Sequence, residues 1–304
     1  PGVHTLTLRV DNTYALDVGV NAHSVSDNTQ TNWNGVVGEM KLLARDRVAL
    51  AGVQVYPEVK EKRIRVLVTL AKNSLATVPG TLTVTATLQG GASLPPLVKE
   101  VTAGAFFGRE EFYYPMGDAP RLWNEFDPAL YVLKIELAAS DGETQYMDSR
   151  EMVFGMRELG VDGTQFILNG ERIFLRGTLE CSIFPRTGYP PTDVESWMKI
   201  LGAAKDHGLN HLRFHSWCPP EAAFVAGDRM GFLFHVEGPF WTHPGDGDPL
   251  DAYIIDECDR ILDAYGNHPS FGFLAYGNEP GGKKSEAFLG ELVARWKEKD
   301  PRRL

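Results

Sequence analysis

The sequence predicts a multidomain protein of mixed β and α/β fold, in which β-sandwich domains precede the first half of a (β/α)8 TIM barrel. Up to about residue 155, short β-branched or aromatic runs follow one another, with Pro, Gly or Asn between them. From residue 166 onward, such runs alternate with segments of helical periodicity, which is typical of a parallel sheet. We therefore expect the end of one sandwich in residues 1–50, an immunoglobulin-like sandwich in residues 51–157, and the barrel segment in residues 158–304.

The first fifty residues have the pattern of an incomplete sheet. Residues 3–10 alternate between apolar and polar side chains and stop at Asp11, which predicts a strand followed by a turn. A polar stretch rich in Asn, Ser and Thr follows at residues 21–35, and a second strand is expected at residues 36–43. Two or three strands are too few to fold independently. We interpret this region as the C-terminal part of a larger β-sandwich.

The second region contains six expected strands. They occupy residues 53–56, 63–71, 80–89, 97–103, 110–114 and 131–138. Their short lengths, and the turn residues between them, favour an immunoglobulin-like sandwich. Trp123 and Tyr131 are interpreted as aromatic residues of its core.

The third region contains four strand–helix units. The strands are expected at residues 173–180, 211–217, 232–237 and 271–277, and the helices at residues 193–207, 219–230, 251–265 and 285–299. Glycine follows two of these helices, at Gly208 and Gly266, and glycine commonly ends helices. Consecutive units of this kind predict parallel strands joined by right-handed crossovers.

Four units are half of what a closed (β/α)8 barrel requires. Residues 300–304 lie where a fifth strand is expected, so we interpret the chain as an internal segment of a longer protein. An open, doubly wound sheet is the competing architecture, and it predicts a glycine-rich phosphate loop after the first strand. Residues 178–185 contain no glycine, which favours the half barrel.

Composition and charge exclude several classes of protein. The formal net charge of -10 argues against a general polyanion binder, so nucleic acid is not an expected partner. Apolar runs stay well short of the roughly 18 residues of a membrane span, and no membrane association is expected. The three cysteines are widely spaced and include no CxxC, so neither a disulfide framework nor a zinc knuckle is predicted. The oligomeric state stays open.

Polar residues recur at the ends of the four predicted strands. The last strand stops at Asn278 and Glu279, which places a carboxylate where barrel enzymes have their active sites. Because side chains alternate along a strand, residues two apart share a face. The sets with a shared face are Arg176, Thr178 and Glu180; His211, Arg213, His215 and Trp217; and His235 and Glu237. We expect these sets to converge on one rim. A solvated loop glutamate, or a structural network of ion pairs, is the alternative.

A carboxylic acid at such a rim suits glycoside hydrolysis. One carboxyl group protonates the leaving oxygen, and a second acts as the nucleophile or as a base toward water. Exposed aromatic side chains provide stacking platforms for sugars. Trp217, Phe240 and Trp241 lie in loops where they could do so, and ordinary packing is the alternative for each.

No metal centre and no cofactor are predicted. His207, His211 and His215 have the spacing of a helical metal triad, but residues 208–210 end the helix between the first two. A metal-dependent hydrolase with zinc at His211 and His215 stays an alternative. Cys218 lacks the sequence setting of a nucleophile.

Taken together, several motifs resemble glycoside hydrolase family 2, which contains β-galactosidases, β-glucuronidases and β-mannosidases. The motifs are Phe-Gly-Met-Arg-Glu at 154–158, Phe-Ile-Leu-Asn-Gly at 166–170, Leu-Arg-Gly at 175–177, Asn-His-Leu-Arg-Phe-His at 210–215, Asp-Arg-Met-Gly at 228–231 with Glu237, Asn-His-Pro-Ser at 267–270, and Gly-Asn-Glu at 277–279. The resemblance implies a jelly-roll domain, an immunoglobulin-like domain and a catalytic barrel, in that order.

The resemblance also implies a retaining hydrolase of O-glycosidic bonds whose partner is a carbohydrate. Glu279 would be the general acid/base, Asn278 would bind the hydroxyl next to the anomeric carbon, and His215 and Glu237 would line the sugar site. The rim contributes further candidate sugar contacts, which are Arg213, Glu180 and Trp217. The nucleophile of the family is a glutamate at the end of the seventh barrel strand. That strand is expected beyond residue 304, so this chain alone is expected to be inactive.

The chain departs from the family pattern in two loops. Residues 178–185 replace a loop that carries histidine in familiar members, and residues 216–220 replace a shorter turn. Because these loops face the sugar, ordinary β-galactosidase specificity is not implied, and an exo-acting enzyme on the end of an oligosaccharide or polysaccharide is expected. The alternative from another class is a non-catalytic carbohydrate-binding or scaffolding protein whose barrel has lost its chemistry.

Overall fold

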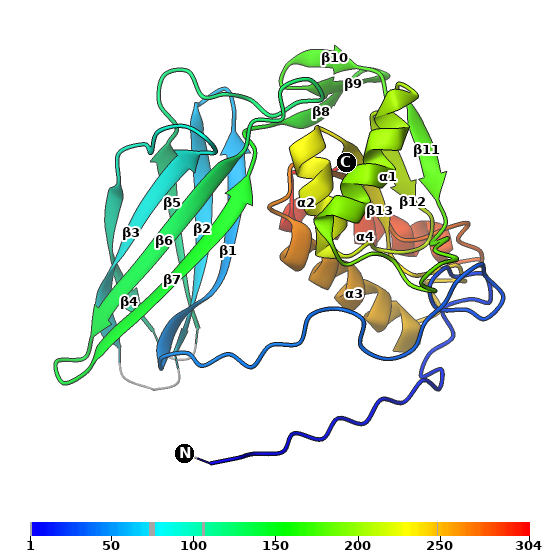
Figure 1. Cartoon of the computed structure of the whole chain (residues 1–304), viewed down its shortest axis with the longest axis horizontal. Helices are drawn as coiled ribbons and strands as arrows, with labels where there is room; N and C mark the ends of the chain where they lie inside the picture. The colour runs from blue at the N-terminus through cyan, green and yellow to red at the C-terminus, as the bar shows by residue number, and fades with distance from the viewer. Residues whose placement is uncertain (1, 73–76, 105–106, 248) are drawn as a thin grey trace.

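The computed structural model of the protein describes residues 2–72, 77–104, 107–247 and 249–304. It contains a β-sandwich and, beside it, a parallel sheet with its helices; an irregular N-terminal segment precedes both (Figure 1). Among the described residues, every helix is too short or too polar to cross a membrane.

Seven antiparallel strands form the sandwich. They are β1 (Val48–Glu58), β2 (Arg63–Lys72), β3 (Val78–Leu88), β4 (Leu97–Ala103), β5 (Phe107–Pro115), β6 (Tyr131–Ser140) and β7 (Gln145–Phe154). One sheet has the order β1-β2-β5 and the other the order β4-β3-β6-β7. Inward-facing residues of both sheets, among them Val66, Leu82 and Ile135, are fully buried in one shared core. The predicted sandwich is therefore present.

Strand β7 is the one that the sequence pattern did not predict, whereas the six expected strands are all found. It lies at the edge of its sheet and carries Asp148, Arg150 and Glu151. Charged residues are typical of edge strands, because they hinder pairing with another chain. Apolar periodicity is therefore a weak signal for such a strand.

The strands predicted at residues 3–10 and 36–43 are wrong. In the described segment before the sandwich, backbone pairing is limited to one bridge, between Ser24 and Asn32. Apolar side chains of the first predicted strand are exposed, and Leu6 is 77% exposed. A strand needs a neighbouring strand and a buried face, and this segment as described has neither. In the described structure, residues 3–10 and 36–43 are therefore not part of a sheet.

A small antiparallel sheet links the sandwich to the parallel sheet. It consists of β8 (Leu159–Asp162), β9 (Gln165–Leu168) and β10 (Glu171–Ile173), in the order β10-β9-β8. The single strand predicted at residues 173–180 is wrong, because β10 ends before the parallel sheet begins with β11 (Gly177–Glu180). Gly177 packs so closely against His211 that an added Cβ would lie 2.8 Å from its ring. Glycine permits this close approach of two strands.

Four parallel strands in sequential order make up the main sheet, as the βα pattern predicts. Strand β11 is followed by β12 (His211–Phe214), β13 (Leu233–Glu237) and β14 (Phe271–Ala275), and the helices are α1 (Val194–Asp206), α2 (Glu221–Met230), α3 (Pro249–Tyr265) and α4 (Ser285–Lys299). All three pairings are parallel. Strands β12 and β14 end earlier than predicted, at Phe214 and Ala275 instead of residues 217 and 277.

Aromatic side chains fill the space between this sheet and its helices. The rings of Phe214 and Phe234 meet edge to face, 5.1 Å apart between centroids. Trp197 of α1 packs on Phe214, and Phe224 of α2 packs on Phe234. All four are fully buried. On the opposite face of the sheet, His211 and His235 pack against Phe273.

Leu304 lies beside β14 in the position of a further parallel strand. Its N–H donates to the carbonyl of Gly272 at 3.1 Å, and its own carbonyl accepts from the N–H of Leu274 at 3.3 Å. Bonds that alternate in this way are the pattern of a parallel pair. In the described residues the sheet is open, with β11 at one edge and Leu304 at the other.

Hydrogen bonds fix the sandwich to the parallel sheet. Arg302 donates to the carbonyl of Val55 at 2.8 Å and to Oδ1 of Asn267 at 3.0 Å. Asn267 also bonds to strand β1, since it donates to the carbonyl of Val53 and accepts from the N–H of Val55. Arg157, which is buried, donates to three backbone carbonyls near the start of β14 and after α4. These bonds set the position of one part relative to the other.

Candidate functional site

Polar side chains meet at the carboxyl edge of the parallel sheet. The residues that meet there are Glu180 at the end of β11, Arg213 and His215 around the end of β12, Glu237 at the end of β13, and Asn278 after β14. In an open parallel sheet and in a barrel alike, this is the edge where ligands bind. The rim that the strand pattern predicts is thus a place where these groups lie together.

Arg213 connects two of the other strand ends. Its Nε donates to Oε1 of Glu237 at 2.6 Å, and its Nη2 donates to Oδ1 of Asn278 at 2.8 Å. The planar guanidinium has donors in a fixed fork, so it holds both acceptors in a defined geometry. The arginine thereby fixes the ends of β13 and β14 relative to each other.

Glu237 is fully buried and has a partner on each carboxylate oxygen. Oε2 accepts from the backbone N–H of Ser216 at 2.6 Å, while Oε1 accepts from Arg213. Burial nevertheless raises the pKa of Glu237 above its ordinary value, because the loss of hydration outweighs the effects of Arg213 and Ser216. Hydrogen bonds to both carboxylate oxygens therefore hold the side chain of Glu237 in place.

Glu180 is anchored by the loop that follows it. Its carboxylate accepts from the N–H groups of Ser182 at 2.9 Å and Ile183 at 3.1 Å. Burial raises its pKa, and these two bonds oppose the shift. The carbonyl of Glu180 accepts from the N–H of His215 at 2.9 Å. Glu180 therefore ties the end of β11 to the turn after β12.

His215 contacts a histidine from the N-terminal segment. Nδ1 of His215 lies 3.1 Å from Nδ1 of His23, and the two rings are nearly perpendicular. Trp241 packs on both rings, with centroids 5.0 Å from His215 and 6.2 Å from His23. Burial lowers the pKa of His215, and the charges of His23 and Arg213 lower it further; burial also lowers the pKa of His23. Both imidazoles are therefore neutral at neutral pH.

Glu279 differs from its neighbours because its side chain is exposed. Its negative charge raises the pKa of His215, against the larger effect of burial, so the carboxylate lies within electrostatic reach of that ring. Asn278, immediately before it, is buried and bonded to Arg213. The predicted acid is thus attached to a rigid residue but faces open space.

Strained backbone follows three of the four strand ends. Ser182, Ser216 and Glu279 have φ values of 56°, 53° and 41°, which residues with a side chain rarely adopt. Such strain persists only where the surroundings enforce it, and it is concentrated at functional sites. The turns at this edge are therefore held in place by the contacts described above.

Trp217 and Phe240 are packing residues. Trp217 is 1% exposed and lies against Phe184, Trp197 and Phe214, so both faces of its indole are covered. The prediction that Trp217 contacts sugar needs correction, because the chain turns at Ser216 and sends the next side chain into the helix-facing core. Phe240 is likewise fully buried. Trp241 is the aromatic residue that lies at the site.

His211 and His215, the pair considered for zinc, have different neighbours. His211 lies against His235 and Phe273 on the inner face of the sheet. Burial lowers the pKa of both His211 and His235 to about 4. His215 instead meets His23, while His207 caps the end of α1. The structure therefore does not bring His211 to His215.

Three residues of this edge were missed by reasoning from the sequence: His23, Ser216 and Cys181. The hydroxyl oxygen of Ser216 accepts from the N–H of His23 at 3.0 Å. Cys181 directly follows Glu180, so the sequence could have predicted its position at the end of a strand. No sequence pattern could join His23 to His215, because 192 positions separate them.

Comparisons with known proteins agree with this architecture. The model of the family described as "Glycosyl hydrolases family 2" matches residues 48–157. A β-galactosidase large subunit of Latilactobacillus sakei is 25% identical over 226 residues, which cover 68% of this chain and 34% of that protein. A β-glucuronidase of Paenibacillus borealis is 40% identical over 199 residues, which cover 60% of this chain and 33% of that protein. The chain spans about a third or less of the length of the curated relatives it matches.

A solved structure shares the fold over nearly the whole chain. It is β-glucuronidase 2 of Bacteroides uniformis, which was crystallised with a covalently bound cyclophellitol-6-carboxylate aziridine. The TM-score is 0.72 at 20% identity, and the match covers 97% of this chain and 38% of that one. Matches to the sequence family, to its enzymes and to their fold agree. The match of residues 48–157 to the family model, and the relatives in sequence, support family 2 of the glycosyl hydrolases as the family of this chain.

Proposed function

We propose that the protein is a retaining exo-glycosidase and that this chain provides the acid/base side of its active site. Its relatives are named β-galactosidases and β-glucuronidases. The observation that carries the proposal is the bonding of Arg213 to both Glu237 and Asn278, directly beside Glu279. Arg213, Glu237 and Asn278 form a hydrogen-bonded group next to the exposed carboxyl group of Glu279. This arrangement suits a reaction in which Glu279 transfers a proton to a bound sugar.

Glu279 is the best candidate for the acid/base among the three carboxylates of this edge. Both oxygens of Glu237 are engaged by Arg213 and Ser216. Glu180 accepts two backbone N–H groups. Glu279 is exposed, so a leaving-group oxygen can approach it. Asn278, held by Arg213, is then suited to bind a sugar hydroxyl beside the reacting carbon.

The pairing of Leu304 with β14 supports continuation of the sheet into a (β/α)8 barrel. Retention of the anomeric configuration requires a second carboxylate about 5–5.5 Å from the first. This second carboxylate attacks the anomeric carbon. We place this nucleophile on a later strand of the barrel. The 304-residue polypeptide by itself should then hydrolyse no glycoside.

The test is a comparison of leaving groups in the natural full-length protein. A panel of aryl glycosides of both anomers, with neutral and acidic sugars, first identifies the substrate. Glu279→Gln should then lower kcat/KM by about 100-fold or more on a phenol that leaves poorly. The effect on a dinitrophenyl glycoside should be much smaller, because that group leaves without protonation. Proton NMR of the sugar that is released first should show the same anomeric configuration as the substrate.

Glu286→Gln is the matched control, because Glu286 is an exposed glutamate in the first turn of α4. This variant should leave kcat/KM unchanged on both substrates. Equal losses on good and poor leaving groups in Glu279→Gln would contradict the assigned role. Sugar binding without turnover of any glycoside would favour the carbohydrate-binding alternative.

A further inference from the structure

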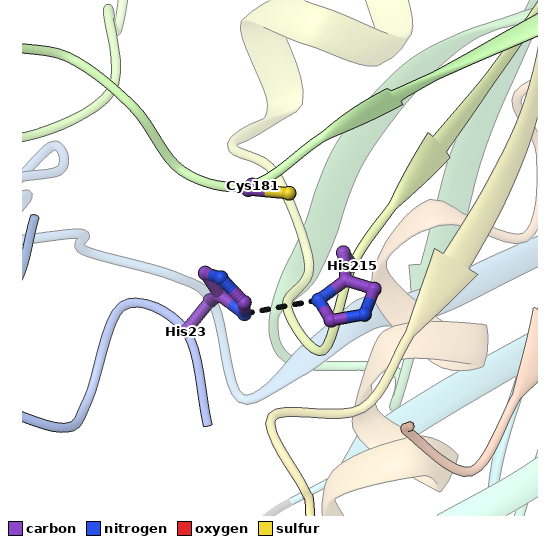
Figure 2. Close-up of side chains that lie close together, drawn as sticks. All are labelled: His23, Cys181 and His215. Carbon is purple, nitrogen blue, oxygen red and sulfur yellow. Dashed lines mark hydrogen bonds between the residues drawn. The ribbon is translucent and has the colours of Figure 1, made fainter. Parts of the chain in front are cut away.

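His23, Cys181 and His215 form a cluster at the carboxyl edge, and Figure 2 shows their side chains turned toward one another. One potential ligand atom from each lies within 4.8 Å of the other two. The three residues come from the N-terminal segment, the loop after β11 and the turn after β12. Segments distant in sequence therefore deliver two imidazoles and one thiol to one point.

We propose that this cluster binds a zinc ion, which attaches the N-terminal segment to the carboxyl edge of the parallel sheet. Zinc prefers imidazole nitrogen and thiolate sulfur, and it accepts three protein ligands with a fourth position left open. The cluster offers two nitrogens and one sulfur but no carboxylate. This donor set disfavours magnesium and calcium, which prefer oxygen ligands.

The geometry of the cluster is close to what zinc requires. Tetrahedral bonds of about 2.0–2.3 Å place neighbouring ligand atoms roughly 3.3–3.6 Å apart. The two Nδ1 atoms of His23 and His215 are already 3.1 Å apart. One ligand atom from each of the three residues lies within 4.8 Å of the others, so the longest separation must shorten by about 1 Å. Cys181 lies in the loop after β11 and is only partly buried, so its sulfur is the ligand atom best able to move.

Neighbouring groups hold the two histidines in place. His23 is buried, and its backbone N–H donates to Oγ of Ser216 at 3.0 Å. The same Oγ lies 2.9 Å from Nδ1 of His23, a contact that metal binding through Nδ1 would replace. The N–H of His215 is bonded to the carbonyl of Glu180. These two backbone bonds fix the positions of His23 and His215 at the edge of the sheet.

Binding requires one chemical step, the loss of the thiol proton of Cys181 to solvent as the sulfur–zinc bond forms. No oxidation or reduction is involved. Through Nδ1, His215 would bind the metal and retain its other ring nitrogen for the adjacent sugar site. The inference does not rest on the proposed hydrolase activity, because a non-catalytic protein with this cluster would bind zinc equally well.

The test uses purified protein freed of metal with a chelator, to which Zn²⁺ or Co²⁺ is added alone. Calorimetry should give one Zn²⁺ per chain, and Co²⁺ should produce a thiolate-to-metal charge-transfer band together with the visible bands of tetrahedral cobalt. Cys181→Ser should abolish the charge-transfer band and weaken Zn²⁺ binding by at least about tenfold. Zn²⁺ should also slow proteolysis of the N-terminal segment in the unmutated protein.

Cys218→Ser and His207→Gln are the matched controls, since both residues lie outside the cluster. Both should retain the cobalt spectrum. Absence of stoichiometric Zn²⁺ binding in the unmutated protein would overturn the inference. So would a charge-transfer band that persists in Cys181→Ser or disappears in Cys218→Ser. If Cys181→Ser fails to fold, His23→Gln serves instead, and it should lower the affinity while the sulfur band remains.

Discussion

Nε of Arg213 lies 2.6 Å from Oε1 of Glu237, whose side chain is completely buried. Removal of the guanidinium would leave a buried carboxylate without its charged partner. Arg213→Met should therefore destabilise the protein by about 3 kcal/mol, toward the lower end for buried pairs because Arg213 itself is about a third exposed. Denaturant unfolding at neutral pH measures this loss.

The double variant Arg213→Met/Glu237→Gln should recover part of that stability, because it removes the unpaired charge as well. Lys134→Met is the control, since its ion pair with Glu136 is exposed on both sides. It should change the free energy of unfolding by less than about 1 kcal/mol. A loss of the same size for Lys134→Met and Arg213→Met would show that the buried pair has no special weight.

Trp217 and Trp241 should respond differently to truncation. Trp217 is enclosed by aromatic rings, so Trp217→Ala should cost about 3–5 kcal/mol of stability through the cavity it leaves. Trp241 is half-buried against His23 and His215, so Trp241→Ala should chiefly raise KM for the glycoside. Thermal unfolding and steady-state kinetics on both variants separate the effects. The opposite assignment would restore Trp217 as a sugar contact.

Acid should destabilise the fold through His211 and His235. Their pKa values are about 4 in the folded protein, against about 6.5 in an unfolded chain. Between these values the unfolded state binds more protons, so stability falls as the pH drops from about 6.5 to about 4. Each group contributes a loss of up to roughly 3 kcal/mol. Burial is the main cause of the lowered pKa of His235, and the charges of His211 and Arg213 add to it.

Unfolding midpoints measured across this pH range check the prediction. His235→Gln should flatten the dependence of stability on pH. His207→Gln, which alters an exposed histidine at the end of α1, should leave the slope unchanged. An unchanged slope in His235→Gln would place the acid sensitivity elsewhere.

Gly19 should be required for docking of the N-terminal segment. Its φ is 99°, and an added Cβ would overlap the carbonyl oxygen of Trp241. The adjacent bond from the N–H of Trp241 to the carbonyl of Val18, at 2.9 Å, would then break. Gly19→Ala should release the segment, with faster cleavage in limited proteolysis. Gly35→Ala is the control, because Gly35 has a similar φ of 91° but no atom within 4 Å of the added group.

Much of the site follows from strand periodicity. Arg213, Glu237 and Asn278 lie at the ends of strands that the apolar pattern predicts, and the structure brings them into direct contact. Trp217 shows the limit of that reasoning. Strand β12 ends at Phe214 and a left-handed residue follows, so alternation no longer describes where the next side chains point.

The N-terminal segment could not be placed from its own pattern. Residues 3–10 alternate like a strand but have no partner in the described structure, and alternation states a preference without supplying the neighbour. The position of His23 depends on tertiary contacts with Ser216 and His215. Such contacts between distant segments leave no local signal in the sequence.

Ser216 uses its backbone N–H on Glu237 and its hydroxyl on His23. One residue therefore couples the buried carboxylate to a segment almost two hundred positions earlier in the chain. Thermodynamic linkage makes this coupling reciprocal. A ligand that favours the present orientation of Glu237 must also favour docking of the N-terminal segment. A partner that draws this segment away must lower the affinity for that ligand by the same factor.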